Sequence, residues 1–296
     1  MSIKSFTQRL GSEIEDPDEE TFYLFSQPAV SQDLGFVDSK ADAIELHIVG
    51  RDLTISQSQG LLCSNRAEGT TGAVLWRVTP LLASWLALGN NVLSEMGIIS
   101  PDSSIVELGC GSSGILPLIL APRIRRFVAT DQAYVFKLLR HNLETNAEGY
   151  STSIPPNRSR SSKKSFLNEP RSIINNVDLL ALDWEKSSAA SLSSCLPSGE
   201  TVDLVIACDC IYNEALIQPF VDTCVDICQL REASPSAGHK RTVCIIAQQL
   251  RSDSVFVEFL SAFCKAFNVW RVPDEICGEN LTPAKGFVVQ VGILKL

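Results

Sequence analysis

The sequence predicts an α/β fold in which helices cover both faces of a doubly wound sheet. From residue 105 onward, apolar runs of strand length alternate with segments of helical pattern, as in consecutive β-α units. A glycine-rich turn follows the first run, and acidic residues follow the next three. Of the 296 residues, 45% are hydrophobic, and no linker separates two cores. We therefore expect one large domain.

Three features are expected before this sheet. Residues 1–40 are polar and acidic and are predicted to be partly disordered, whereas residues 41–100 form an N-terminal extension of a domain at 41–296. Two segments alternate apolar and polar residues and predict a hairpin, residues 44–49 and 53–56. Residues 78–96 are predicted as one long helix, with Trp85 in the core rather than on a ligand.

The first strand of the sheet, residues 105–108, runs into a turn with glycines at 109, 111 and 114, and a helix is expected from Ile115. Glycine allows a ligand to approach the backbone closely, and the helix start offers free N–H groups. The spacing alone is shared with dinucleotide-binding proteins. Glu107, however, would repel a pyrophosphate, which favours a ligand with cationic or hydroxyl groups.

Acids end the next three strands, Asp131 after 126–130, Asp183 after 177–182 and Asp209 after 203–208. The carboxyl ends of parallel strands share one edge of a sheet, so these acids converge with Glu107. Asp131 is placed to accept hydrogen bonds from ribose hydroxyls, unless it caps the following helix. Asp183 is placed to accept from an adenine amino group beside Trp184, unless both belong to a surface turn with a buried indole.

The remaining elements continue the alternation. We expect helices at 133–146, 215–230 and 253–267, and strands at 242–248, 269–272 and 287–294. Residues 149–172 are rich in Ser, Pro, Arg and Lys and predict a low-complexity loop insertion. A plain solvated insertion is favoured over contact with ribosomal RNA through its basic residues, which are Arg158, Arg160, Lys163 and Lys164.

Two motifs flank the glycine turn in the sequence. Thr71-Gly72-Ala73-Val74-Leu75-Trp76 precedes the long helix, and Asp209-Cys210-Ile211-Tyr212 follows the fourth strand. With Glu107-Leu108-Gly109 and Asp183-Trp184, they resemble the seven-β-strand (class I) protein-lysine methyltransferases, and within them the fungal ribosomal lysine N-methyltransferase 5 group. The resemblance covers residues 40–296 and implies a Rossmann-like seven-stranded methyltransferase fold whose last strand is antiparallel.

The resemblance also implies an activity, methylation of a protein lysine with S-adenosyl-L-methionine as cofactor. It assigns a cofactor-binding set, which is Trp76, Glu107, Gly109, Gly111, Asp131, Asp183, Trp184 and Cys208. Asp209 and Tyr212 would be catalytic, the first orienting the amine and the second supplying a ring face and a hydroxyl. Core packing remains an alternative for Trp76, and burial at a helix start for Tyr212. The implied substrate is a large-subunit ribosomal protein, the one at the mobile stalk.

Composition narrows the class of partner. A net charge of −9 disfavours direct nucleic-acid binding and suits a basic protein substrate. The acids at residues 13–20 are interpreted as a solvated tail in preference to a docking arm. Ten cysteines and three histidines show no zinc spacing, so no metal is expected. A cytoplasmic enzyme is expected, because the cysteines form no disulfide framework and neither a signal peptide nor a membrane-spanning run is apparent.

Three other functions remain open. An NAD-dependent oxidoreductase would share the glycine turn, but the sequence offers no group that would assist hydride transfer. A small-molecule or nucleic-acid methyltransferase would keep the cofactor, although base-amine methyltransferases often carry a proline pair where Cys210 and Ile211 stand. A non-catalytic S-adenosylmethionine-binding module is the third.

Overall fold

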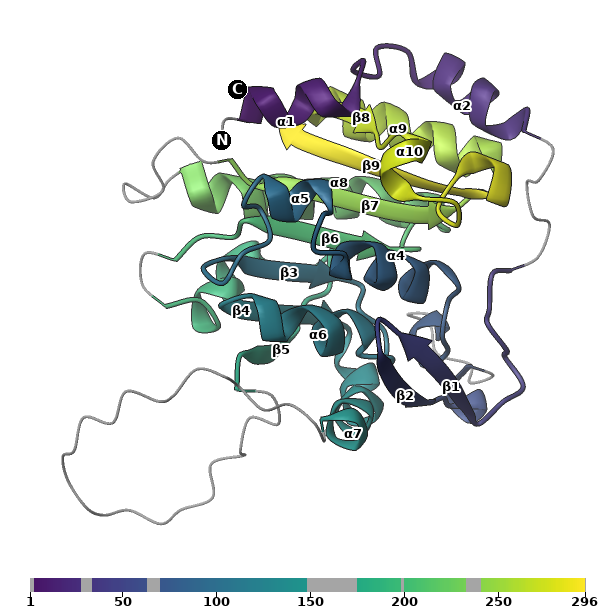
Figure 1. Cartoon of the computed structure of the whole chain (residues 1–296), viewed down its shortest axis with the longest axis vertical. Coiled ribbons are helices and arrows are strands. Elements are labelled where there is room, and N and C mark those ends of the chain that lie inside the picture. The colour runs from purple at the N-terminus through teal and green to yellow at the C-terminus, as the bar shows by residue number, and fades with distance from the viewer. Residues whose placement is uncertain are drawn as a thin grey trace.

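The computed structural model describes residues 3–27, 34–62, 70–147, 175–197, 200–232 and 241–295. Within them, one seven-stranded sheet has the order β5-β4-β3-β6-β7-β9-β8 (Figure 1). Its strands are β3 (Ser104–Leu108), β4 (Arg126–Asp131), β5 (Val177–Ala181), β6 (Leu204–Cys208), β7 (Val243–Gln249), β8 (Phe267–Arg271) and β9 (Phe287–Leu294). A separate hairpin pairs β1 (Ala43–Ile48) with β2 (Arg51–Ser56).

Strand direction confirms the predicted fold. Strands β3 to β7 pair in parallel, whereas β9 lies antiparallel between β7 and β8. The last strand is therefore inserted antiparallel, as the resemblance implies. A mainly parallel sheet whose order reverses beside β3 is Rossmann-like, and it gathers ligand-binding residues at the carboxyl ends of its strands.

Helices cover both faces of the sheet (Figure 1). Helices α4 and α6 pack together on one face, and α8 and α9 pack together on the other. The helices are α1 (Ile3–Leu10), α2 (Pro17–Phe25), α3 (Gln59–Leu62), α4 (Val78–Ala87), α5 (Val92–Glu95), α6 (Ile115–Leu120), α7 (Phe136–Asn146), α8 (Ile217–Glu232), α9 (Asp253–Ala266) and α10 (Asp274–Cys277). Short 3-10 turns include η1 (Thr71–Ala73) and η5 (Glu214–Leu216).

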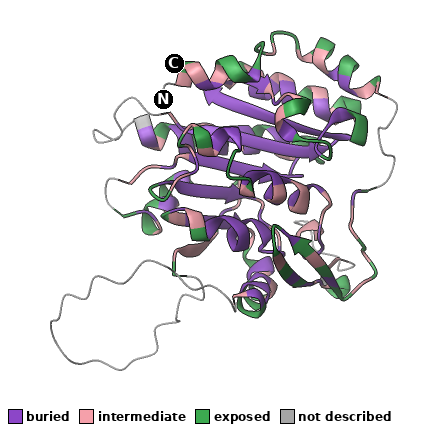
Figure 2. Ribbon diagram, in the orientation of Figure 1, coloured by how far each residue is buried: buried purple, intermediate pink, exposed green. Residues whose placement is uncertain are grey.

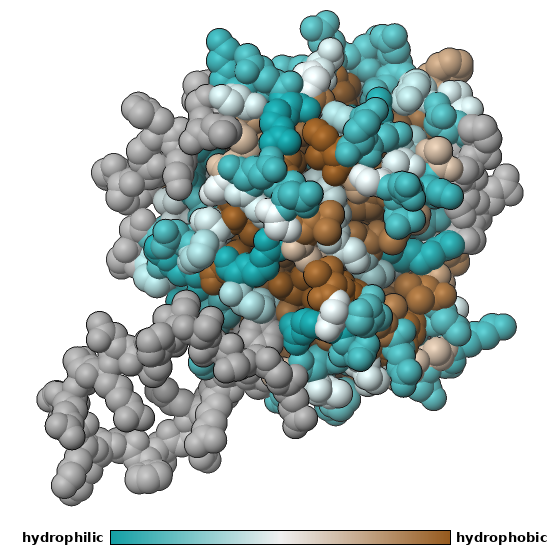
Figure 3. All heavy atoms as spheres, viewed as in Figure 1, coloured by the Kyte–Doolittle hydropathy of each residue, from teal (hydrophilic) through white to brown (hydrophobic). Residues whose placement is uncertain are grey.

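Alternate residues of each strand supply the two cores. Ile105 packs into the cluster under α4 and α6, while its neighbour Val106 packs into the cluster under α8 and α9. This follows from the two-residue period of a strand, and it explains why the central strands are apolar throughout. The central strands β3, β6 and β7 are accordingly buried, and hydrophilic residues surround the hydrophobic ones on the α4 face (Figures 2 and 3).

The predicted hairpin is confirmed, and its turn has a clear cause. Val49 and Gly50 have φ angles of 49° and 77°. Two consecutive positive φ values are the mark of a type I′ turn, which matches the twist of paired strands.

The long helix predicted at 78–96 is wrong as one element. It is divided into α4 and α5, because Asn91 caps α5 by accepting a hydrogen bond from Leu93 N at 2.7 Å. Gly89 also lies in the break, and glycine has a lower helix propensity than any residue except proline. Trp85 is 4% exposed and donates its indole N–H to Ile276 O at 2.7 Å, which confirms that it is a core residue.

Two helices form within the N-terminal acidic segment. Asp16 caps α2 by accepting from Asp18 N and Glu19 N, and Leu24 is fully buried beside α9. Glu20 pairs with Arg271 at 2.9 Å, so part of the predicted tail is fixed against β8. The boundary at residue 40 and the extension at 41–100 stay predictions.

The loop insertion predicted at 149–172, with its basic cluster, lies outside the described residues. In the part of the chain that is described, no helix combines the length and the apolar character that a membrane span needs. Nor do the described His, Cys, Asp and Glu side chains form a group of three or more suited to a metal ion.

Candidate active site at the carboxyl rim of the sheet

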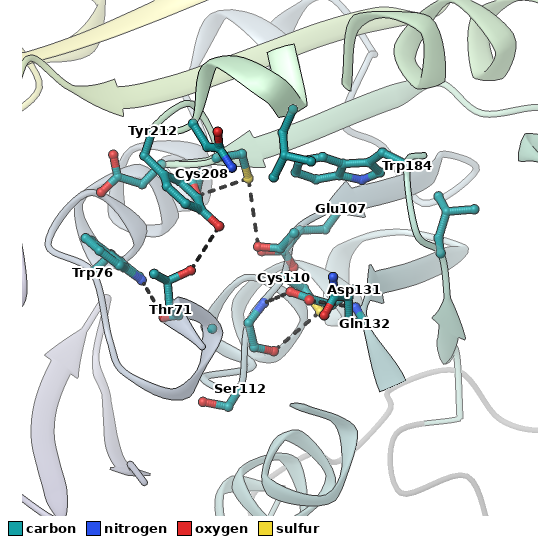
Figure 4. A pocket seen from close by; sticks show the side chains of 18 of the residues that line it. Thr71, Trp76, Glu107, Cys110, Ser112, Asp131, Gln132, Trp184, Cys208 and Tyr212 are labelled. Carbon is teal, nitrogen blue, oxygen red and sulfur yellow. Dashed lines mark hydrogen bonds between the residues drawn. The ribbon is translucent and has the colours of Figure 1, made fainter. Parts of the chain in front are cut away.

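A cavity of about 460 Å³ lies at the carboxyl ends of β3, β4 and β6 (Figure 4). Its size suits a small organic ligand. The structure brings all the sequence-predicted site residues to its wall, namely Trp76, Glu107, Gly109, Gly111, Asp131, Asp183, Trp184, Cys208, Asp209 and Tyr212. Their convergence follows from the topology, because parallel neighbours end at the same edge.

Two glycines of the turn, Gly109 and Gly111, have little room for a side chain. Gly109 and Gly111 have φ angles of 65° and 59°, which disfavour other residues. A Cβ on Gly109 would lie 2.6 Å from Cys210 Sγ, and one on Gly111 would lie 3.3 Å from Gly72 O. Ser112 N also donates to Gly72 O at 2.8 Å. The turn is thus fitted tightly against the segment that leads to Trp76.

Glu107 is 2% exposed, and its Oε2 is a buried atom without a hydrogen-bond partner within the described residues. Burial, and then the nearby Asp131, raise the pKa of Glu107 well above its usual value. A buried carboxyl oxygen without a donor is costly, so this position favours a ligand that brings N–H or cationic groups.

Asp131 is held at the end of β4 by two backbone donors. Gly111 N donates to Oδ2 at 2.8 Å, and Gln132 N donates to Oδ1 at 2.6 Å. Burial raises the pKa of Asp131 to about 6, against the lowering effect of these hydrogen bonds. The N-cap of the following 3-10 turn is Gln132, so the capping alternative for Asp131 does not hold.

The Asp183-Trp184 pair combines features of both sequence interpretations. Asp183 accepts from Glu185 N at 3.0 Å and pairs with Lys186 at 3.1 Å, as in a surface turn. The Trp184 indole contacts Phe220 edge-on, with ring centroids 5.1 Å apart. It nevertheless lines the cavity beside Gly109 and offers a flat wall for a ring.

Trp76 and Tyr212 lie together at the other end of the cavity (Figure 4). Trp76 donates its indole N–H to Thr71 O at 3.1 Å, and Thr71 Oγ1 donates to the Tyr212 hydroxyl at 3.2 Å. Tyr212 is 45% exposed, so burial at a helix start is not its role. Partial burial raises the pKa of Tyr212, against the lowering effect of the hydrogen bond with Thr71.

Asp209 has a partner that sequence analysis missed. Its side chain is 1% exposed and forms a bidentate ion pair with Arg251, in which Nη1 lies 2.9 Å from Oδ1 and Nη2 also pairs with Oδ2. The backbone of Asp209 has a φ of 57°, unusual outside glycine. An amine therefore cannot approach a free carboxylate here while the guanidinium stays in place.

Beside Asp209, the cavity wall includes a neutral thiol. Burial, followed by the nearby carboxylates of Glu107 and Asp209 and the Cys210 thiol, raises the pKa of Cys208 well above its usual value. Cys208 therefore contributes an uncharged wall and not a nucleophile.

Sequence analysis also missed other lining residues, and for some a signal existed. Thr71 and Gly72 belong to the motif that ends at Trp76, and Ser112 and Ser113 belong to the glycine turn. Their places in these two motifs were the signal that they line the cavity. Arg251 follows β7 at the same rim as the acids. Its position two residues after β7 could have predicted the ion pair, because β6 and β7 are parallel neighbours and Asp209 follows β6 at the same edge of the sheet.

The lining fits S-adenosylmethionine on structural grounds. The unpartnered Glu107 oxygen matches a ligand with a cationic amino group, and Asp131 lies where hydroxyl donors would complete its hydrogen bonds. Trp184 supplies an apolar wall for a ring. A pyrophosphate fits less well, because the carboxyls of Glu107 and Asp131 flank the turn and would repel it.

A model of the lysine methyltransferase family matches residues 163–263, which include β5, β6, Asp209 and Tyr212. A diaminohydroxyphosphoribosylamino-pyrimidine deaminase of Schizosaccharomyces pombe is 29% identical over 262 residues, covering 87% of this chain, which spans only 53% of that protein. Among solved structures, an rRNA methylase from Streptococcus thermophilus is 13% identical with a TM-score of 0.41, covering 75% of this chain and all of that one.

The relative that shows the family comes from Zygosaccharomyces rouxii and is named ribosomal lysine N-methyltransferase 5. It is 34% identical over 240 residues, which cover 74% of this chain and 72% of that protein. A protein of the same name in Vanderwaltozyma polyspora is 28% identical, covering 81% of this chain and 85% of its own. The cavity, the sheet order and these relatives agree, and the chain belongs to the ribosomal lysine N-methyltransferase 5 family of S-adenosylmethionine-dependent protein-lysine methyltransferases.

Proposed function

We propose that this lysine methyltransferase acts in the cytoplasm on a large-subunit ribosomal protein, the one at the mobile stalk. The observation that carries the proposal is the relatives' printed name, which assigns a ribosomal lysine to several fungal proteins of similar length. The acidic net charge of −9 supports a basic protein as partner, because ribosomal proteins are rich in lysine and arginine.

The cofactor would occupy the closed end of the cavity, between the glycine turn and Trp184. Glu107 would accept from the amino group, Asp131 from the ribose, and Asp183 from the adenine, with Trp184 against the ring. Gly109 and Gly111 would allow its close approach, while Trp76 and Cys208 would line the side toward the acceptor. When bound, S-adenosylmethionine would supply an electrophilic methyl group for direct in-line transfer to the lysine nitrogen, with cleavage of its sulfur–methyl bond and departure of S-adenosylhomocysteine, so the protein would need no nucleophile of its own.

The acceptor lysine would enter beside Tyr212, where the cavity wall is partly exposed. The Tyr212 ring supplies a face for the alkyl chain, and its hydroxyl is held by Thr71. A free lysine amine has a pKa of about 10.4, and attack requires its neutral form. Partial burial at the acceptor end, beside the positive sulfonium of a bound cofactor, would disfavour the ammonium, and water at the exposed edge of Tyr212 would take its proton. Asp209 lies at this end, bound to Arg251.

The test is transfer of labelled methyl groups to proteins of an extract from cells that lack the enzyme. Purified wild type is expected to label one large-subunit ribosomal protein, and Asp131→Ala is expected to abolish the band. Asp102→Asn is the matched control, because it removes a carboxylate that is 85% exposed and outside the cavity. A labelled protein that is not ribosomal would refute the proposed substrate, and label only in RNA or small molecules would favour the alternative acceptors.

A further inference from the structure

The side chain of Arg251 joins three segments at the acceptor end of the cavity. Its Nη1 donates to Asp209 at 2.9 Å, its Nε donates to Leu34 O at 3.0 Å, and its guanidinium carbon lies 5.2 Å from the Trp76 ring centroid. The three contacts come from the loop after β6, the segment before β1 and the segment before α4. The Arg251 side chain therefore fixes the positions of two cavity-lining residues, Asp209 and Trp76, relative to each other and to Leu34.

The contact with Asp209 is built to hold a strained turn. Asp209 adopts a left-handed backbone conformation, and its Oδ1 also accepts from Gln249 N at 3.2 Å. A buried carboxylate left without its cation is strongly destabilising, so Arg251 keeps this side chain and the turn leading to Tyr212 in one conformation. An arginine suits this role because its planar fork contacts both carboxylate oxygens at once.

Gly35 shows independently that the chain before β1 is fitted to Arg251. It has a φ of +84°, and a Cβ at this position would lie 2.6 Å from Arg251 Nη2 and even closer to the Gln249 side chain. Its carbonyl accepts from Arg77 N at 2.9 Å, and the next residue, Phe36, forms a β-bridge with Trp76. The ring centroids of Phe36 and Trp76 are 4.6 Å apart.

From these contacts we infer that Arg251 is a positioning residue for methyl transfer, which holds Asp209 and Trp76 on one wall of the acceptor entrance and fixes residues 34–36 beside that wall. The inference rests on the proposed lysine-methyltransferase function. It also gives Asp209 a different role from that of a free amine-binding carboxylate, because the amine meets a wall whose charge Arg251 already balances. Arg251 acts through Asp209 and Trp76, without contacting the transferred methyl group.

The first test is a double-variant cycle on the rate of protein labelling. The substrate is total protein extract from cells lacking the enzyme, and active sites are counted by calorimetric titration with S-adenosylhomocysteine. Arg251→Gln is expected to lower the initial rate per active site at least about tenfold, with unchanged S-adenosylhomocysteine affinity. The double variant Arg251→Gln/Asp209→Asn is expected to lose no more than the worse single variant, because both act through one contact. Arg251→Lys should restore only part of the rate.

A second pair of variants leaves every charged group in place. Gly35→Ala is expected to lower the rate per active site severalfold by displacing Arg251. Gly11→Ala is its matched control, since Gly11 has a φ of +86° and open space around it, and it should keep the wild-type rate. This pair tests the inference even where Arg251→Gln fails to fold. Arg125→Gln controls for loss of an arginine outside the cavity.

The outcomes separate the inference from the function on which it rests. An active wild type with an equally active Arg251→Gln, or single-variant losses that multiply in the double variant, overturns the inference alone. Equal rates for Gly35→Ala and Gly11→Ala would likewise overturn the inference and leave the proposed function standing. A wild type that binds S-adenosylhomocysteine and labels no protein overturns the proposed function, and the inference with it.

Discussion

Glu107 and Asp131 face the same cavity from neighbouring strands, but among the described residues Asp131 has two backbone donors on its carboxylate and Glu107 Oε2 has none. Burial and the charge of Asp131 raise the pKa of Glu107 well above its usual value. Two acids in one enclosed space are unfavourable in the protein alone and become favourable once a cationic ligand lies between them. This relationship leads to the first two predictions.

The stability of the cofactor-free protein should fall as the pH rises from about 4 to about 6. The pKa of Asp131 is raised from 3.8 to about 6 on folding, so folding favours its protonated form. The resulting contribution to stability is complete below pH 4 and is lost as the pH passes through 6. The raised pKa of Glu107 extends the loss to higher pH. Urea unfolding across this range measures the effect, and Asp131→Asn should flatten it. Stability that rises over the interval would contradict the prediction.

Glu107→Gln should have opposite effects on stability and on cofactor affinity. The substitution removes a buried carboxyl whose Oε2 has no partner within the described part of the chain, and the free energy of unfolding at neutral pH should rise by about 1–2 kcal/mol. S-adenosylmethionine should bind at least about tenfold more weakly, because the carboxylate that accepts from its amino group is lost. Denaturation and calorimetry measure the two. Glu45→Gln, on the exposed side of β1, should change neither. Unchanged affinity in Glu107→Gln would exclude the carboxylate from the cofactor site.

Gly109→Ala should weaken cofactor binding far more than Gly97→Ala. Both glycines have similar φ angles, 65° and 70°, so the backbone strain of about 1–2 kcal/mol is shared. Only Gly109 has a neighbour, Cys210 Sγ, within 2.6 Å of an added Cβ. The turn must therefore shift in Gly109→Ala alone, and we expect at least a tenfold loss of S-adenosylhomocysteine affinity by calorimetry. Equal losses in the two variants would show that strain, not the shape of the turn, governs binding.

Tyr212→Phe and Tyr212→Ala should separate the hydroxyl from the ring. The hydroxyl accepts one hydrogen bond from Thr71, so Tyr212→Phe should lower kcat/KM for the protein substrate by no more than about tenfold. Loss of the ring face in Tyr212→Ala should lower it by more than about a hundredfold through misplaced substrate. Cofactor affinity should stay constant in both. A larger loss in Tyr212→Phe would instead give the hydroxyl a direct part in proton transfer.

The sheet and the residues that line the cavity could be predicted from the sequence, and the reason is the burial pattern of the strands. The central strands are buried on both faces, so a strand such as β6 appears in the sequence as an unbroken apolar run that is followed by an acid. Topology then brings those ends to one rim, and no side-chain detail is needed to predict that Glu107 and Asp131 are neighbours.

Other features depend on contacts that no local pattern contains. The Asp209–Arg251 pair joins residues 42 positions apart, and the apolar helical pattern of 78–96 concealed a break at Asn91. Helix α2 is held by Leu24 in the cluster with α9 and by the ion pair between Glu20 and Arg271, and helix α1 by Phe6 and Leu10 in the other core cluster. Composition suggested a tail, since acids dominate that segment, and only tertiary packing makes it ordered.

The most direct test of the account is the intact mass of every large-subunit ribosomal protein from three kinds of cell. One lacks the enzyme, one carries wild type, and one carries Asp131→Ala at equal abundance. The account predicts that a single ribosomal protein is heavier by one or more methyl groups only in the wild-type cells, with the added mass on one lysine. Identical masses in all three would contradict ribosomal lysine methylation by this protein.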